Sequence, residues 1–175
     1  MDSVFTRKYQ EVQKYFDNEE YSKSLELGLI LFSEFEITSN ISLRYLSGFI
    51  LGENFSKIND HEKAIFYFKK ALFLLQDELL LDGPVVSAFK GVHKNHYFLA
   101  DNLLKIGIEY SRLKKKDSAI SYYNKIIQMD FLDDDLLSLK AATYNNLSAT
   151  YIGIGSYDLA KKYALQAVEI RRLHK

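Results

Sequence analysis

The stretch Ile106-Gly107-Ile108-Glu109-Tyr110 opens a pattern that continues at Ala119, Tyr123 and Ile126. Two further stretches repeat this pattern without gaps. They are Leu51-Gly52-Glu53-Asn54-Phe55 with Ala64, Phe68 and Ala71, and Leu147-Ser148-Ala149-Thr150-Tyr151 with Ala160, Ala164 and Ala167. In each copy an aromatic residue precedes an alanine by nine positions, and an aromatic or small residue follows four positions later. Repetition of this kind predicts a stack of similar supersecondary units.

A fourth, weaker copy lies near the N-terminus, where Tyr15 is followed by Ser24, Gly28 and Leu31. It keeps the nine-residue spacing but has Glu11-Val12 where the other copies have an aliphatic and a small residue. In every copy the small residue lets a neighbouring helix approach closely, and the alanine of the second segment does so from the other side. We therefore expect each copy to be a pair of packed helices.

The order aliphatic, small, aromatic, then alanine, aromatic and small resembles the tetratricopeptide repeat (TPR) signature. The resemblance implies an all-α fold: a right-handed α–α superhelix, or TPR-like solenoid, of about eight helices in four antiparallel pairs. Equivalent positions from Ser24 through Ala64 and Ala119 to Ala160 are 40, 55 and 41 residues apart. The standard period is about 34 residues. The chain is thus similar to the long-period variants found in sensor and peptide-receptor domains of bacterial signalling proteins.

The pattern predicts helices over 3–17, 20–37, 40–57, 60–81, 94–115, 117–130, 134–153 and 156–173. They form a single domain, 1–175, with repeats at 3–37, 40–81, 94–130 and 134–173 and an insertion at 82–93, which begins with Asp82-Gly83-Pro84. We expect a capping box from Asn59 and Glu62, and helix caps at Asp117 and Ser156. Lys114-Lys115-Lys116 is expected at a helix C-terminus, where cations suit the helix dipole.

Composition narrows the class of partner. Lys+Arg and Asp+Glu number 23 each, so the formal net charge is zero and nucleic-acid binding is not expected of this chain. Cysteine is absent, which excludes disulfides, thiolate nucleophiles and zinc sites built on sulfur. The N-terminus has no apolar segment typical of a signal peptide, and no apolar run approaches the length of a membrane span. We therefore expect a cytoplasmic protein without membrane contact.

No constellation predicts catalysis or a cofactor. His93 and His96 would share one helical face and could hold a metal, but no third ligand lies nearby, so we interpret them as surface polar residues. The acidic run Asp133-Asp134-Asp135 lacks the glycine and glutamate of a calcium loop and suits a helix start. Catalytic and phosphate-binding motifs are also absent, so we expect no enzyme activity.

The resemblance implies that the first helix of each repeat lines a concave groove that holds a peptide. By register the groove residues are Tyr9, Gln13, Phe49, Glu53, Ser56, Asp101, Lys105, Ile108, Arg112, Ala142, Asn145, Asn146, Ala149 and Ile152. Asn145 and Asn146 offer donors and acceptors for a peptide backbone, unless they are simply solvated. Lys105 and Arg112 either grip a carboxylate or form an ordinary solvated basic patch. The dicarboxylate clamp of chaperone-binding TPR domains is not expected, because its Lys and Asn positions hold Tyr9 and Gln13.

The expected function is non-catalytic binding of another protein or peptide in this groove. One alternative is the sensor portion of a bacterial signalling or transcriptional regulator that responds to a peptide, with the 55-residue spacing acting as a hinge. A second alternative is structural self-assembly, as a homodimer through an uncapped C-terminal helix. The residues left for that contact are Leu159, Tyr163, Ile170 and Leu173.

Overall fold

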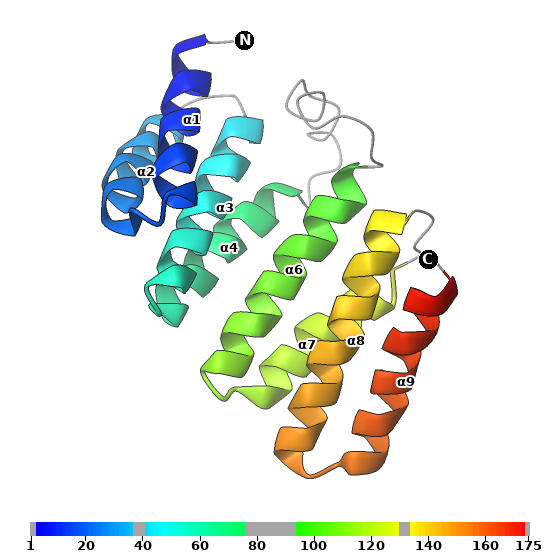
Figure 1. The fold of residues 1–175 in the computed structure, drawn as a ribbon. Coiled ribbons are helices and arrows are strands. Elements are labelled where there is room, and N and C mark those ends of the chain that lie inside the picture. Colours follow the sequence, from blue (N-terminus) through cyan, green and yellow to red (C-terminus); the bar gives the residue numbers. More distant parts are fainter. Residues whose placement is uncertain (1–2, 37–40, 76–93, 130–133, 174–175) are drawn as a thin grey trace. The chain divides into compact units, whose positions relative to one another are not determined.

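Helices are the only regular elements in residues 3–36, 41–75, 94–129 and 134–173, which are the residues that the computed structural model describes. The helices are α1 (Ser3–Asp17), α2 (Tyr21–Glu36), α3 (Ile41–Lys57), α4 (His61–Leu75), α6 (Lys94–Arg112), α7 (Lys116–Ile127), α8 (Asp134–Ile154) and α9 (Tyr157–Leu173). Consecutive helices run antiparallel as the pairs α1/α2, α3/α4, α6/α7 and α8/α9 (Figure 1). This confirms the expected all-α, TPR-like fold class.

The chain divides into two compact units, Met1–Lys90 and Gly91–Lys175. The first unit contains the pairs α1/α2 and α3/α4, and the second contains α6/α7 and α8/α9. The boundary falls inside the expected insertion 82–93, which lies outside the described residues, as do positions 76–81 of the helix expected over 60–81. That both units belong to a single domain stays a prediction.

The turn inside each pair is the same in all four copies. One residue adopts a left-handed backbone conformation: Glu19, Asn59, Lys114 and Gly155, with φ of 62°, 63°, 60° and 86°. The next N–H donates to the carbonyl of the repeat's aromatic residue, as Lys115 does to Tyr110 at 2.9 Å. The left-handed residue itself donates one turn back, as Lys114 does to Ser111. This is the Schellman pattern that ends many helices.

These turns explain the nine-residue spacing. In the third pair, the N–H of Lys115 donates to the carbonyl of Tyr110, five residues earlier, and the carbonyl of Lys115 accepts from the N–H of Ala119, four residues later. Together the two bonds span the nine residues from Tyr110 to Ala119. The small residues that donate in this way are Ser24, Ala64, Ala119 and Ala160. Ser24 in the weaker copy makes the same bond, and its hydroxyl also donates to the carbonyl of Val12 at 3.0 Å. The N-terminal copy is therefore a genuine repeat of the turn.

Two expectations about helix ends were wrong. Asp60, not Asn59, caps α4, because Asn59 is the left-handed residue of the turn. The N–H of Lys63 donates to Asp60 Oδ1 at 3.1 Å, so Glu62 lies in the first turn and is not the partner of a capping box. The helix expected over 94–115 ends at Arg112, since Lys114 turns the chain.

Because α6 ends at Arg112, the expected position of the lysine triplet Lys114-Lys115-Lys116 was also wrong. Lys115 is the N-cap of α7 and makes no capping bond with its side chain, and Asp117 lies in the first turn of the helix, not at the cap. Lys115 and Lys116 therefore stand at a helix N-terminus, where a cation is unfavourable, not at a C-terminus. Lys116 Nζ instead donates to the carbonyl of Gly153, at the C-terminal end of α8, where a cation is favourable. Ser156 does occupy the position before α9.

The glycines of the repeat lie against buried aromatic rings. A Cβ on Gly52 would lie 2.5 Å from the ring of Phe68, and one on Gly107 would lie 2.4 Å from the ring of Tyr123. Both rings are fully buried. The third copy has Ser148 in place of the glycine and Ala164 in place of the aromatic residue. The smaller side chain on the second helix leaves room for a larger one on the first.

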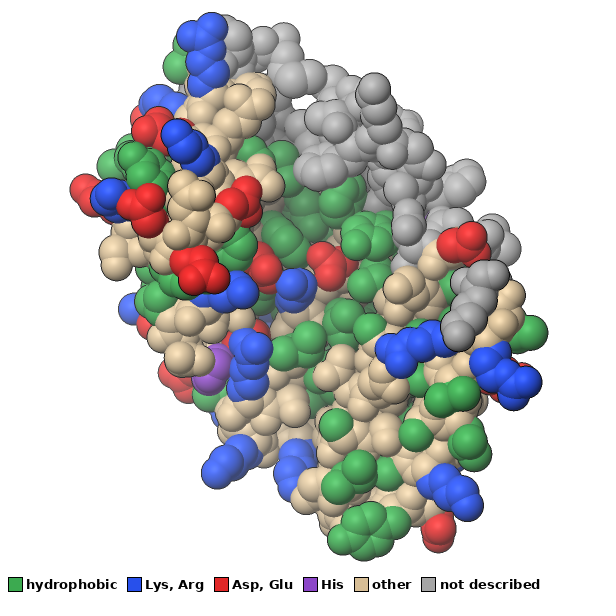
Figure 2. Space-filling view, in the orientation of Figure 1, with side chains coloured by type: hydrophobic (Ala, Val, Ile, Leu, Met, Phe, Trp, Pro, Cys, Tyr) green, Lys and Arg blue, Asp and Glu red, His purple; other side chains and the backbone are tan. Residues whose placement is uncertain are grey.

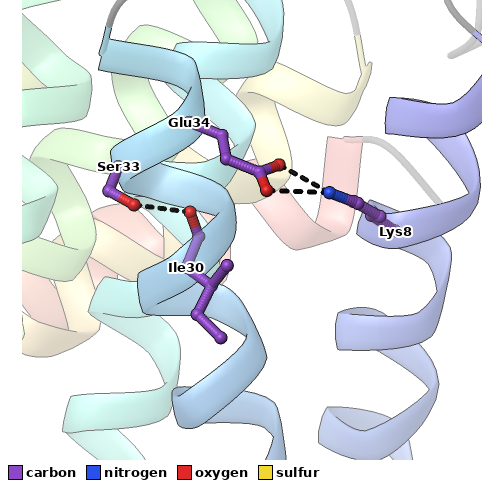
Figure 3. Close-up of polar contacts among 4 residues, drawn as sticks. All are labelled: Lys8, Ile30, Ser33 and Glu34. Carbon is purple, nitrogen blue, oxygen red and sulfur yellow. Dashed lines mark hydrogen bonds and ion pairs between the residues drawn. The ribbon is translucent and has the colours of Figure 1, made fainter.

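The first pair is tied together by both polar and apolar contacts. Lys8 Nζ lies 2.8 Å from each carboxylate oxygen of Glu34, linking α1 to α2 (Figure 3). A core of Val12, Leu31 and Ile50 also joins α1, α2 and α3. Because the ion pair is about half exposed, we attribute most of the stability of this contact to the apolar core.

The Asp60 cap yields a prediction for stability and its pH dependence. The hydrogen-bonded Lys63 ammonium, 2.9 Å from Asp60 Oδ2, holds the pKa of this carboxyl below its ordinary value of 3.8. A depressed pKa in the folded state means that the contribution is present above the ordinary pKa and is lost as the pH falls through the folded value. Asp60→Ala should cost about 1 kcal/mol at neutral pH and less in acid. Urea unfolding at neutral and acidic pH measures this, and Asp60→Asn, which keeps an acceptor oxygen, should lose less.

Candidate protein-interaction surface

The first helices present narrow accessible stripes between buried residues. Between Ala100 and Glu109 of α6, the partly exposed side chains are those of Asp101, Lys105 and Ile108, and the rest are buried. Their spacing of four and three residues places them on one helical face, which Arg112 continues. The structure therefore brings the four residues predicted on this helix together on a single accessible face.

The stripe on α3 is narrower and partly belongs to the core. Between Tyr45 and Phe55 only Phe49 and Glu53 are partly exposed, and Ser56 follows them on the same face. The ring of Phe49 lies 5.5 Å from that of the buried Phe68. Phe49 is therefore an apolar residue at the margin of the core, with only one side open to a ligand.

On α1 the two predicted residues separate. Gln13 is exposed. Tyr9 instead packs against the core of Val12, Leu31 and Ile50, and its burial, with a smaller contribution from Asp17, raises the pKa of its hydroxyl to about 12. Tyr9 therefore stays protonated at neutral pH, and its packing in the core is enough to explain its presence.

On α8 the two asparagines differ in their surroundings. Asn145 is exposed and, with its amide oxygen turned toward α9, accepts from the two terminal nitrogens of Arg171 at 3.2 and 2.6 Å. Asn146 is half-buried, and its Nδ2 donates to the carbonyl of Ala142 at 3.0 Å, which leaves Oδ1 to accept a bond from a ligand. Sequence reasoning treated them as a pair, but Asn145 is already bound to α9.

The charge of the α6 stripe is also partly satisfied within the chain. Arg112 Nη1 donates to Glu109 Oε1 at 2.7 Å, and Glu109 is only 2% exposed. A buried carboxylate needs such a partner. Arg112 therefore stabilises the buried carboxylate of Glu109. A ligand carboxylate that binds Arg112 would have to share its guanidinium with Glu109.

Sequence reasoning missed an aromatic stack in each complete repeat. The stacked rings are Phe55 with Tyr67, Tyr110 with Tyr122, and Tyr151 with Tyr163, at centroid distances of 5.3, 5.5 and 5.4 Å. The second ring always lies three positions after the repeat alanine, so the spacing in the sequence contained the signal. Tyr163 also stacks on Tyr144, so it packs against α8 and does not belong to an outer face of α9.

The turn between α8 and α9 gathers exposed apolar side chains (Figure 2). Ile152, Ile154 and Tyr157 are 55%, 44% and 70% exposed. Ile152 is the last residue of the predicted stripe on α8, and its exposure leaves it accessible to a ligand. The stripe residues before it include Ala149, which is exposed, and Ala142, which is partly exposed.

The described ranges offer neither a metal-binding cluster nor a membrane-spanning helix. They contain no cluster of three or more His, Asp or Glu side chains that could hold a metal ion. His96 is exposed, whereas His93, Asp130 and Asp133 lie outside the described residues. No helix in the described part of the chain has the length and apolar character needed to cross a membrane.

Comparison with known proteins agrees with this geometry. The tetratricopeptide repeat family model matches residues 49–72, 100–131 and 141–172, together half of the chain, and the chain therefore belongs to the tetratricopeptide repeat family. The matched segments cover the three complete copies, and the turn geometry adds the fourth. Proteins of this family generally mediate protein–protein interaction and are not catalysts.

Two solved structures of MamA share the fold. One is 20% identical, covers 96% of this chain and 78% of its own, and has a TM-score of 0.66. The other is also 20% identical, covers 96% of this chain and 73% of its own, and has a TM-score of 0.65. No curated protein sequence matches the chain. Identity this low supports the fold and leaves the ligand to be inferred from the surface itself.

Proposed function

We propose that the chain is a non-catalytic module that binds a peptide or protein segment along the accessible stripes of its first helices. The observation that carries this proposal is the α6 stripe. Asp101, Lys105 and Ile108 remain accessible on a helix whose other central residues are buried. Asp101, Lys105 and Ile108 present an acid, a base and an aliphatic side chain on one accessible helical face, a mixture that suits recognition of a protein segment.

Within the second unit, α6 and α8 pack against each other and supply complementary chemistry. Ile108 and Ile152 offer apolar contacts, while Asn146 Oδ1 can accept from the backbone N–H of an extended peptide. Lys105 and Asp101 add charges of opposite sign along the same face. A mixed surface of this kind suits a protein segment better than a nucleic acid, which would require a basic excess.

The test begins with a pull-down by the intact chain, followed by titration of the partner identified. Ile108→Ala/Asn146→Ala should weaken binding by about tenfold or more, since it removes one apolar contact and one hydrogen-bond acceptor. Asn124→Ala on the second helix α7 is the matched control and should leave the affinity unchanged. Unchanged affinity of the double variant, with an unaltered melting curve, would remove the groove assignment.

Self-association through α9 is a second candidate, favoured by one observation. Leu165, Val168 and Leu173 are 59%, 52% and 73% exposed along one helix, and with Glu169 and Arg172 they line a shallow hollow. Apolar surface of this kind is typical of a protein contact. Light scattering across a range of concentrations tests the idea, and a monomer at the highest concentration would remove it.

A further inference from the structure

The outer side of the first unit contains a hollow that the groove does not use. It has a volume of about 480 Å³ and is formed by side chains of α2, α3 and α4. The lining residues are Phe32, Arg44, Phe66, Lys69, Lys70, Phe73 and Leu74. Ligand pockets in proteins have volumes of about 300–1,000 Å³. The hollow is therefore large enough to hold a bulky side chain of another molecule.

Two phenylalanines beside the hollow are open to solvent. Phe66 is 52% exposed and Phe73 is 74% exposed. They lie seven residues apart on α4, so they share one face of that helix. A soluble domain that leaves two phenyl rings this exposed on one face usually uses that face for contact.

The other three repeats show that the fold does not need phenylalanine there. The residues in register with Phe66 are Glu26, Ser121 and Lys162, and those in register with Phe73 are Ser33, Gln128 and Glu169. All six are polar and exposed. Because the same helix-pair geometry forms with polar residues at both positions, Phe66 and Phe73 are not required by packing.

Among the described residues that line the hollow, the charged ones are all basic. Arg44, Lys69 and Lys70 line it, and none of its described lining residues is acidic. Lys70 Nζ lies 5.5 Å from the ring of Phe66 and 5.8 Å from that of Phe32, within range of a cation–π interaction with each. These contacts place the ammonium group beside the phenyl rings that line the hollow.

We propose that this hollow docks an acidic segment of a partner protein that carries a bulky apolar side chain. The apolar side chain would pack against Phe32, Phe66 and Phe73, while neighbouring carboxylates would face Arg44, Lys69 and Lys70. Concavity favours this occupant over an anionic membrane, because a lipid surface is flat and has no side chain to insert. Six of the seven described lining residues belong to the second helices α2 and α4, and none is a groove residue, so the site is separate from the groove proposed above.

A direct binding test uses a fluorescent synthetic peptide in which glutamate alternates with leucine and phenylalanine. The intact chain should bind it saturably, and Phe66→Ser/Phe73→Gln should weaken binding by about tenfold or more. Those two replacements are the residues that the α6/α7 repeat has in register, Ser121 and Gln128, so the variant is designed to fold. Val4→Ser/Ile58→Gln, which removes exposed apolar surface outside every proposed site, is the control and should change little.

The charge requirement is tested in parallel. Lys69→Glu/Lys70→Glu should abolish most of the binding, whereas Lys161→Glu/Lys162→Glu makes the same charge change on α9 and should have little effect. A peptide with lysine in place of glutamate should not bind. The proposal is overturned if the acidic peptide does not bind saturably, or if the Phe66/Phe73 variant binds it normally.

The membrane alternative has its own outcome. Sedimentation with phosphatidylcholine vesicles, with and without phosphatidylglycerol, measures it. Phenylalanine-dependent binding to the anionic vesicles would assign the hollow to a membrane and overturn the protein-docking proposal. Absence of vesicle binding together with saturable peptide binding supports it. The groove variant Ile108→Ala/Asn146→Ala should bind the peptide normally, which separates this proposal from the proposed function.

Discussion

Replacing Tyr123 by alanine is expected to lower the free energy of unfolding by about 3–5 kcal/mol. The ring is fully buried between α6 and α7, and it lies directly against the backbone of Gly107. Its loss leaves a cavity that the rigid helix pair cannot close fully. Urea unfolding followed by helical circular dichroism measures the change.

Gly107→Ala should show that the ring and the glycine act as one unit. Alone, the added Cβ would lie 2.4 Å from the ring of Tyr123, and overpacking of this kind costs about 1–3 kcal/mol. In the Tyr123→Ala background the space is open, and alanine is about 1 kcal/mol more favourable than glycine inside a helix. The sign of the Gly107→Ala effect should therefore reverse between the two backgrounds.

The third repeat supplies the control for this cycle. Ser148 and Ala164 occupy the positions of Gly107 and Tyr123, so no large ring opposes the small residue. Ser148→Ala should change the free energy of unfolding by less than about 1 kcal/mol. If Gly107→Ala destabilised the chain equally with and without the tyrosine ring, the proposed contact would not be the cause.

Arg112→Met is expected to cost about 2 kcal/mol of stability, whatever happens to ligand binding. The guanidinium is bonded to Glu109, whose side chain is 2% exposed. Without it a buried carboxylate loses a charged partner, and water cannot replace that partner fully. The measurement is again unfolding in urea, at low and high salt, and the loss should persist in salt because the carboxylate is buried.

Removing the carboxylate as well should restore most of that loss. Asn54 and Thr150 are in register with Glu109, so the repeat accepts a neutral polar residue at this position. Glu109→Gln/Arg112→Met should therefore be closer to the parent chain than Arg112→Met alone. Equal stability of the single and double variants would mean that the ion pair contributes little. The result also shows whether weaker ligand binding by an Arg112 variant reflects a lost ligand contact or a lower stability of the chain.

Much of the fold was predictable because the repeat is defined by residue types at short, fixed spacings along the chain. The nine-residue spacing of Tyr110 and Ala119 reflects two consecutive backbone hydrogen bonds around one turn. The spacing is therefore the same wherever this turn recurs. Helix ends were less predictable, since Asn59 and Asp60 are both good capping residues in isolation. The choice between them depends on which residue takes the left-handed conformation, and the hydrogen bonds of the whole turn decide this.

The candidate surface was predictable only as a set of positions. Asp101, Lys105 and Ile108 fall on one face because helical period fixes them there. Their partners could not be predicted, because the pairing of Asn145 with Arg171 joins residues 26 positions apart on different helices. The hollow beside Phe66 likewise requires three helices to meet, and the sequence shows neither that Phe66 and Phe73 are exposed nor what surrounds them.

By itself, the sequence determined the class of protein: an all-helical chain of four repeated pairs, whose small and aromatic residues recur at fixed spacing because each turn is closed by the same backbone bonds. Tertiary structure decided which polar groups remain available. It pairs Arg112 with Glu109 and brings Asn145 close to Arg171, and it gathers Arg44, Lys69 and Lys70 from two helices around one hollow. The physical reason is that burial and pairing depend on distances between helices, which local spacing does not encode.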